Sequence, residues 1–184
     1  MWQIGRGVIK QDKDNTDQIS WFVMKEEKAY RIVHDDPTTK SLLVLGRERV
    51  DLLCEQALNK QAMTEEISFI SPISQDAKIL CQGANYRQHM IDSGMDPEAK
   101  QFNMFFTKSS ASISPPYGQI KKPSQVQLLD YEIELCLVLA CRTEQSQRIN
   151  QGNLADYVAG VCIGNDVSAR DIQIPQMQFH KGKR

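Results

Sequence analysis

Short apolar runs separated by polar residues open the chain. Residues 18–25 (QISWFVMK) and 28–34 (KAYRIVH) are rich in β-branched and aromatic side chains, which is typical of strands. The pair Glu26–Glu27 between them is a candidate tight turn. Residues 50–60 (VDLLCEQALNK) instead place apolar side chains at the spacing of one helix face. We therefore expect a small β structure that includes one helix.

A polar stretch at residues 71–78 (SPISQDAK) predicts a boundary after this part. Beyond it, residues 85–94 can form about two helical turns that end at Gly94. Strands are expected, the last two of them buried, at 78–83, 102–108, 130–140 and 157–167. Short helical turns are expected at 153–158 and 168–173, and loops at 115–124 and 174–184.

The order of these elements predicts the fold class. No long helix follows each strand, which argues against a doubly wound parallel sheet. The chain is predicted to be α+β and mostly β. We expect a small N-terminal β domain at residues 1–75 and a main domain at residues 76–184.

Composition excludes several classes of protein. The 184 residues are 41% hydrophobic and 24% charged, with a formal net charge of −1, which is ordinary for a globular protein. Neither half is basic enough to indicate a nucleic-acid or membrane-surface partner. No apolar stretch approaches the roughly 20 residues that cross a bilayer, and the N-terminus lacks the apolar segment of a signal peptide. A cytoplasmic location is expected.

The cysteines fit that location. They are odd in number and form no CxxC pair, which favours reduced, buried thiols over a disulfide scaffold. The five are Cys54, Cys81, Cys136, Cys141 and Cys162.

Candidate chemistry begins with acidic residues in the run 130–140 (DYEIELCLVLA). Glu132 and Glu134 share one face of the expected strand, roughly 6–7 Å apart at Cα, so their stems can converge on a hard divalent cation. A strand with one solvated face explains the pattern equally simply. Asp166 ends the next apolar strand and could complete a three-carboxylate metal site, although Asn-Asp after Gly is also common in turns.

Two other positions carry weaker signals. His89 and Asp92 lie three residues apart, and on a helix they share a face. The carboxylate would orient the imidazole as a general base, although such pairs are often solvent-exposed. Lys183 follows Gly182 near the last residue, where a lysine is normally just solvated.

Together these stretches resemble the fumarylacetoacetate hydrolase family, in order and in spacing. The resemblance runs from about residue 76 onward, and residues 1–75 lie where family members carry a small N-terminal β domain. The combination E-x-E, then N-D-x-S-A-R-D-x-Q, then G-K carries it. The matching stretches are 78–89, 105–123, 130–140, 156–173 and 182–183.

The resemblance implies a mixed β-roll, usually dimeric, with a Mg²⁺ or Mn²⁺ site. The implied metal ligands are Glu132, Glu134 and Asp166. His89 would be the general base, oriented by Asp92, where the family often has Glu. The implied contacts to substrate or activated water come from Gln173 and Lys183, with Arg170, Lys108 and Tyr86 as further candidates. Larger members also carry an Asp ligand where this chain has Gln82.

The implied activity is metal-dependent hydrolysis of a C–C bond in a 2-oxo or 2,4-dioxo acid of the acylpyruvate type. The same site could instead decarboxylate or isomerise a 2-oxo acid of the oxaloacetate or 2-hydroxyhepta-2,4-dienedioate type, and the sequence does not choose among these reactions. Family members continue past the G-K motif, so the β-roll is expected to be incomplete here. A catalytically incomplete metal-binding fragment and a non-enzymatic β domain are the competing hypotheses.

Overall fold

The computed structural model describes residues 1–10, 18–92, 94–99, 102–140, 148–176 and 179–183. The chain separates into two compact units. The first unit comprises 1–77, 113–120 and 133–164, and the second unit comprises 78–112, 121–132 and 165–184. One division falls at Ala77–Lys78, beside the predicted boundary. The first unit also takes in two later segments, and the domain boundary at residue 75 stays a prediction.

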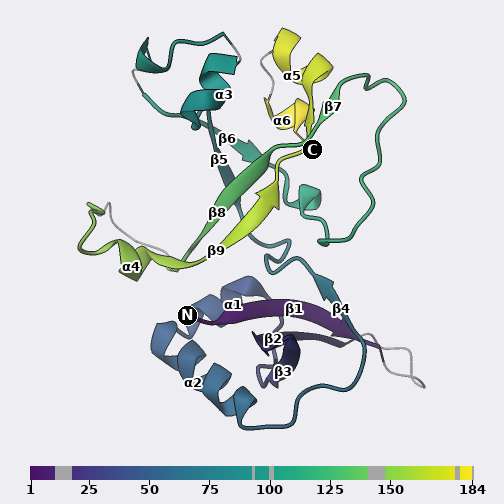
Figure 1. Cartoon of the computed structure of the whole chain (residues 1–184), viewed down its shortest axis with the longest axis vertical. Helices are drawn as coiled ribbons and strands as arrows, with labels where there is room; N and C mark the ends of the chain where they lie inside the picture. Colours follow the sequence, from purple (N-terminus) through teal and green to yellow (C-terminus); the bar gives the residue numbers. More distant parts are fainter. Residues whose placement is uncertain (11–17, 93, 100–101, 141–147, 177–178, 184) are drawn as a thin grey trace. The chain divides into compact units, whose positions relative to one another are not determined.

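A four-stranded antiparallel sheet forms the base of the first unit (Figure 1). Its order is β3-β2-β1-β4, and its strands are β1 (Gln3–Ile9), β2 (Gln18–Lys25), β3 (Lys28–Ile32) and β4 (Ile67–Ile70). The strands predicted at 18–25 and 28–34 are confirmed as β2 and β3. Glu26 and Glu27 make the predicted turn, with φ of 50° and 62°, the backbone of a type I′ hairpin.

Two helices pack with this sheet. They are α1 (Thr39–Val44) and α2 (Arg47–Leu58), so the predicted helix is confirmed and begins three residues before residue 50. Leu53, Cys54 and Ala57 form the buried face of α2, as its apolar spacing predicts. The core of the first unit joins the helices to β2 and β3 through Trp21, Val23, Ile32, Leu42, Leu53, Cys54 and Ala57.

A two-stranded ribbon also belongs to the first unit. It pairs β8 (Ile133–Leu139) with β9 (Val158–Asn165), and α4 (Leu154–Tyr157) precedes β9. The prediction of buried strands here is wrong. Six large apolar side chains on one face of this ribbon are between 56% and 80% exposed. They are Ile133, Leu135, Leu137, Leu139, Val161 and Ile163. The described residues supply no second layer over them.

The second unit contains the other short sheets. β5 (Ile79–Gly83) pairs antiparallel with β6 (Met104–Lys108), and both strands were predicted. β7 (Leu129–Asp130) pairs with β10 (Ser168–Ala169). The run 130–140 is therefore not one strand, because Tyr131 and Glu132 separate β7 from β8 and the two strands have different partners.

Short helices complete the second unit. α3 (Arg87–Asp92) confirms the helix predicted before Gly94. Gly94 has φ of +73°, and the amides of Gly94 and Met95 donate to the carbonyls of Ile91 and Met90, which is a Schellman cap. Two 3₁₀ turns, Pro97–Ala99 and Ser110–Ser112, follow α3 and β6.

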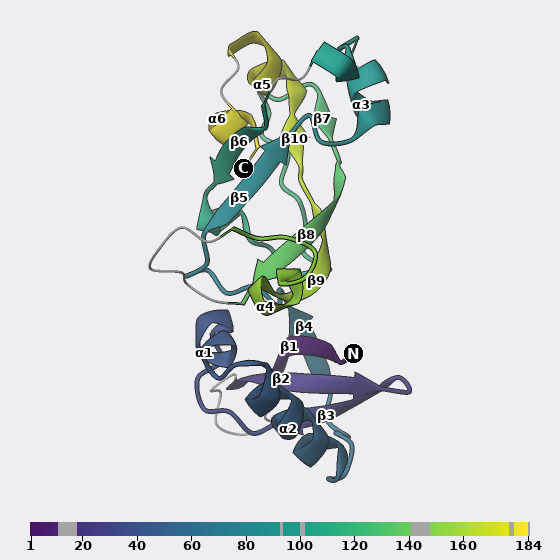
Figure 2. The ribbon, with the colours of Figure 1, turned by 90° about the vertical axis from the view of Figure 1, so that its left-hand side faces the viewer.

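The segment predicted as a loop at 174–184 is partly helical. α5 (Arg170–Gln176) extends past the expected helical turn and includes Pro175, and α6 (Phe179–Gly182) follows it. α5 and α6 pack on each other, and α6 lies against β6 (Figure 2). These tertiary contacts support a four-residue helix that the local sequence does not predict.

The α+β, strand-rich fold class is confirmed. No helix within the described ranges is long and apolar enough to cross a bilayer. The four described cysteines form no disulfide. Cys54 is buried as predicted, whereas Cys81, Cys136 and Cys162 are only partly buried. Cys141 lies outside the described residues.

Candidate active site

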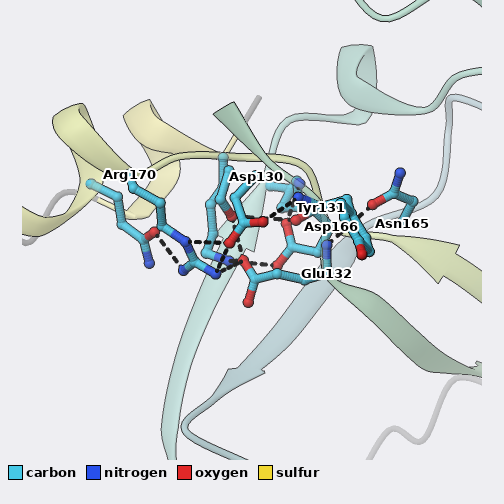
Figure 3. A network of polar contacts seen from close by, with 10 residues as sticks. Asp130, Tyr131, Glu132, Asn165, Asp166 and Arg170 are labelled. Carbon is cyan, nitrogen blue, oxygen red and sulfur yellow. Dashed lines mark hydrogen bonds and ion pairs between the residues drawn. The ribbon is translucent and has the colours of Figure 1, made fainter. Parts of the chain in front are cut away.

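Two carboxylates and two lysines of the second unit form a buried network (Figure 3 shows the carboxylates). Lys183 Nζ lies 2.5 Å from Glu132 Oε1 and 2.8 Å from Asp166 Oδ2. Lys108 Nζ lies 2.5 Å from the other oxygen of Asp166. The side chains of Lys183 and Lys108 are only 4% and 9% exposed. Charges this well buried are normally paired, as they are here.

The backbone brings these groups together from four places in the sequence. Glu132 follows β7, and Asp166 follows β9. The amide of Asp166 donates to the carbonyl of Glu132 at 2.7 Å, and Glu132 N–H donates to Asn165 Oδ1 at 3.3 Å. Lys108 ends β6 and Lys183 follows α6. Of the residues suggested by the sequence, the structure therefore unites Glu132, Asp166, Lys108 and Lys183.

Arg170 extends the network from the start of α5. Its Nε and Nη2 donate to Asp130 Oδ2 at 3.1 and 3.0 Å, and Nη2 lies 3.4 Å from Glu132 Oε1. Its Nη1 donates to Gln173 Oε1 at 3.1 Å. The structure thus joins Arg170 and Gln173, both predicted to contact substrate, to the acidic pair.

The electrostatics of Asp130 follow from this contact. The hydrogen bond from the Arg170 side chain is the main cause that holds the pKa of the Asp130 carboxyl below its ordinary value. An electrostatic interaction with His89 makes a smaller contribution that lowers the same pKa. His89 therefore lies within electrostatic range of Asp130.

Sequence reasoning missed two members of the network. Asp130 is one of the acidic residues in the run 130–140, but sequence reasoning assigned it neither a metal-binding nor a catalytic role. Its spacing from Glu132 matches that from Glu132 to Glu134. Ser168 is fully buried, and its hydroxyl donates to Glu132 Oε1. Ser168 is the serine of the N-D-x-S-A-R-D-x-Q motif, but the motif does not say which side chain its hydroxyl contacts. Its contact depends on β10 pairing with β7.

The other predicted site residues belong to α3, to the segment just before it and to β8. His89 and Asp92 are on α3, and both are exposed. Asp92 Oδ1 accepts a hydrogen bond from Gln88 Nε2 at 2.7 Å. Tyr86, just before α3, is 45% exposed. Glu134 is on β8 in the first unit. The roles of these four residues stay predictions.

The donor set suits a hard cation in part. Glu132 Oε1 and Asp166 Oδ2 both face one ammonium, that of Lys183, so two carboxylate oxygens converge where a cation is stabilised. Such oxygens are the ligands that Mg²⁺ and Mn²⁺ prefer. Among the described residues, no group of three or more His, Cys, Asp or Glu side chains is placed to hold a metal. The predicted third ligand, Glu134, is therefore not part of an assembled set.

Comparison with protein families shows which family this chain belongs to. The family model for the fumarylacetoacetate (FAA) hydrolase C-terminal domain matches residues 78–184, which hold Lys108, Glu132, Asp166 and Lys183. The chain belongs to the fumarylacetoacetate hydrolase family. The resemblance noted in the sequence is confirmed.

Curated members of the family include enzymes named for tautomerisation. Over 120 residues the chain is 36% identical to the oxaloacetate tautomerase YisK of Bacillus subtilis, covering 64% of this chain and 39% of that protein. Over 109 residues it is 33% identical to the mitochondrial oxaloacetate tautomerase FAHD2A of Homo sapiens, covering 59% of this chain and 33% of that protein. The chain thus matches a third to two fifths of these relatives' length.

A solved family structure confirms the fold. The fumarylacetoacetate hydrolase of the psychrophile Exiguobacterium antarcticum superimposes with a TM-score of 0.71 at 26% identity. The match covers 98% of this chain and 62% of that one. Both compact units of this chain therefore have counterparts in a family member.

Proposed function

We propose that this chain carries the site of a divalent-metal-dependent isomerase that interconverts keto and enol forms of a small 2-oxo acid. One observation carries the proposal, namely the buried network of Glu132 and Asp166 with Lys108, Lys183 and Arg170. The relatives named oxaloacetate tautomerase support this reaction. They favour isomerisation over the C–C hydrolysis expected first from the sequence.

The cofactor proposed is Mg²⁺ or Mn²⁺. Glu132 and Asp166 would hold it. When bound, such a cation polarises a keto oxygen and stabilises negative charge that develops on it.

The cationic side chains of the site suit an anionic substrate. Lys183 and Lys108 already neutralise buried carboxylates, so each can stabilise negative charge on an oxygen at the same place. Arg170 presents a planar guanidinium, the group best shaped to bind a carboxylate in two places. We assign the substrate carboxylate to Arg170 and Gln173, with Tyr86 as a further contact.

Proton transfer at carbon is assigned to His89. In this scheme its imidazole removes a proton from the carbon next to the keto group, and Lys183 stabilises the negative charge on the keto oxygen. That oxygen then takes a proton from solvent to give the enol, and the reverse transfers restore the keto form. Asp92 would orient the ring from the next turn of α3. The side chain of His89 is exposed on α3. In this scheme a bound substrate therefore contacts the imidazole at the surface of α3.

A second candidate is hydrolysis of a C–C bond in an acylpyruvate. The superposition on an enzyme named fumarylacetoacetate hydrolase favours it. The residues would keep their places, and His89 would deprotonate a water instead of a carbon. Decarboxylation of a 2-oxo acid would need the same stabilised enolate without that water.

The deciding experiment follows the ultraviolet absorbance of enol-oxaloacetate with Mg²⁺ or Mn²⁺ and purified protein. Faster loss of the enol signal, with no carbon dioxide or cleavage product, supports the isomerase. Glu132→Gln should abolish that acceleration. Cleavage of an acylpyruvate with no effect on the enol would overturn the proposal in favour of the hydrolase. Mn²⁺ binding without turnover of either substrate would show a catalytically incomplete chain.

A further inference from the structure

Gly182 is the last residue of α6 and lies where α6 packs on α5. It is buried and immediately precedes Lys183. A Cβ at Gly182 would lie 2.8 Å from Gln173 Cβ and 2.9 Å from both Cα and N of Gln173. Two of these three neighbours are backbone atoms of α5, which cannot rotate aside. A side chain of any size at residue 182 therefore forces the helices apart.

Other contacts hold α6 against β6. The ring of Phe179 stacks on Phe106 of β6, with centroids 5.2 Å apart. His180 Nδ1 lies 3.0 Å from the carbonyl of Thr107. Since α6 has only four residues, displacement at Gly182 is passed directly to the residue that follows it.

That residue is Lys183, whose side chain is almost completely buried. Its Nζ contacts Glu132 Oε1 and Asp166 Oδ2 and lies 5.4 Å from the centre of the Phe106 ring. Hydrogen bonds weaken steeply once their geometry departs from the ordinary range. A shift of roughly half an ångström, the least that a packed Cβ demands, would strain both ion pairs.

We propose that Gly182 is a positioning residue, whose missing side chain lets α6 rest on the Gln173 backbone and deliver Lys183 to the carboxylates. The proposal rests on the proposed function of Lys183 and adds a reason for the glycine before it. The same contact fixes Gln173, whose amide oxygen accepts from Arg170. One close approach thus places two predicted substrate contacts.

Acetylation of individual lysines tests the position of Lys183 without any assay of activity. In the wild type, Lys183 should react far more slowly than the exposed Lys40. Gly182→Ala should raise the Lys183 rate about tenfold or more relative to Lys40, because the buried ammonium is displaced. Gly160→Ala is the matched control, since a Cβ there meets nothing within 4 Å, and it should leave the ratio unchanged. An unchanged ratio in folded Gly182→Ala would overturn the proposal.

Kinetics supply the second arm. Gly182→Ala should lower kcat by about tenfold or more with a smaller change in KM. In a Lys183→Met background it should cost nothing further, because residues that act through one another are not additive. Multiplicative losses in the double variant would mean that Gly182 acts only on general packing. If the wild type shows no turnover, the proposed function fails while the acetylation result still decides the role of Gly182.

Discussion

At the scale of single residues, the site balances buried charge. Three cations, Lys108, Arg170 and Lys183, face the carboxylates of Asp130, Glu132 and Asp166. Removing one partner of a buried pair leaves an uncompensated charge, which costs more than the intact pair contributes. The stability of the second unit therefore depends on residues that the proposed chemistry also uses.

Lys183→Met tests this dependence. We expect it to lower the free energy of unfolding by roughly 2–3 kcal/mol, because Glu132 and Asp166 lose a shared, buried partner. Ser168 and Arg170 still contact Glu132, which keeps the loss below that of a wholly unpaired charge. Lys40→Met on an exposed position should change stability by less than about 0.5 kcal/mol. Urea denaturation measures both, and equal effects would show that the network is not stabilising.

Asp130 gives the site a predictable response to acid. Its pKa is lowered chiefly by the hydrogen bond from Arg170, so the folded state holds this proton less tightly than the unfolded state. The contribution to stability is therefore complete above about pH 4 and is lost as pH falls through the lowered pKa. Asp130→Asn should destabilise the protein by less than about 1 kcal/mol at pH 7, since the pair is partly exposed.

The acid limb of that prediction is the informative one. The stability difference between wild type and Asp130→Asn should shrink as pH falls through the lowered pKa of Asp130, because the wild-type carboxyl then becomes neutral as well. Denaturation curves recorded between pH 2 and 7 measure it. A difference that stays constant over this range would mean that Asp130 acts through packing and not through its charge.

At the scale of elements, local sequence predicted pairing poorly where pairing is set by distant segments. The run 130–140 alternates up to Glu134 and is apolar from Leu135, which predicts one strand, yet β7 pairs with β10 and β8 pairs with β9. The break between β7 and β8, at Tyr131–Glu132, places the Glu132 side chain in the network. The local sequence pattern does not predict this break. Helices α2 and α3 were predicted because their spacing and the Gly94 cap are local signals.

The site shows the same division. Family spacing indicated Glu132, Glu134, Asp166 and Lys183. The structure brings Glu132, Asp166 and Lys183 into contact, whereas Glu134 is on β8 in the first unit. Ser168 was missed because it acts only after β10 has paired. Asp130 was missed because its partner, Arg170, lies 40 residues away.

The β2–β3 turn allows a prediction at this scale. Glu26 and Glu27 both have positive φ, which disfavours any residue with a branched or long side chain, whereas Asn-Gly suits a type I′ turn. We expect the double change Glu26→Asn, Glu27→Gly to stabilise the first unit by roughly 1 kcal/mol. The midpoint of urea denaturation measures the gain.

A control separates conformation from charge in that turn. The double change Glu26→Ala, Glu27→Ala removes the same two charges but keeps the unfavourable φ. It should give little of the gain. Equal stabilisation by both variants would assign the effect to relief of charge repulsion instead of backbone strain.

At the scale of the whole molecule, the exposed apolar face of β8–β9 predicts how the chain associates. Monomeric proteins rarely expose contiguous apolar patches of more than a few hundred Å². An isolated chain of this sequence should therefore associate through this face.

We expect sedimentation velocity to show association that increases with protein concentration, together with strong binding of the dye ANS. Leu135→Lys with Leu137→Glu should reduce both, because the paired charges interrupt the apolar row at its centre. Both residues are more than half exposed, so the change should not unfold the chain. The matched control is Leu52→Lys, a 40% exposed leucine of α2 that lies off this face. Equal loss of association in the control would place the contact elsewhere, and a monomeric wild type that does not bind ANS would show that this face is covered within the chain.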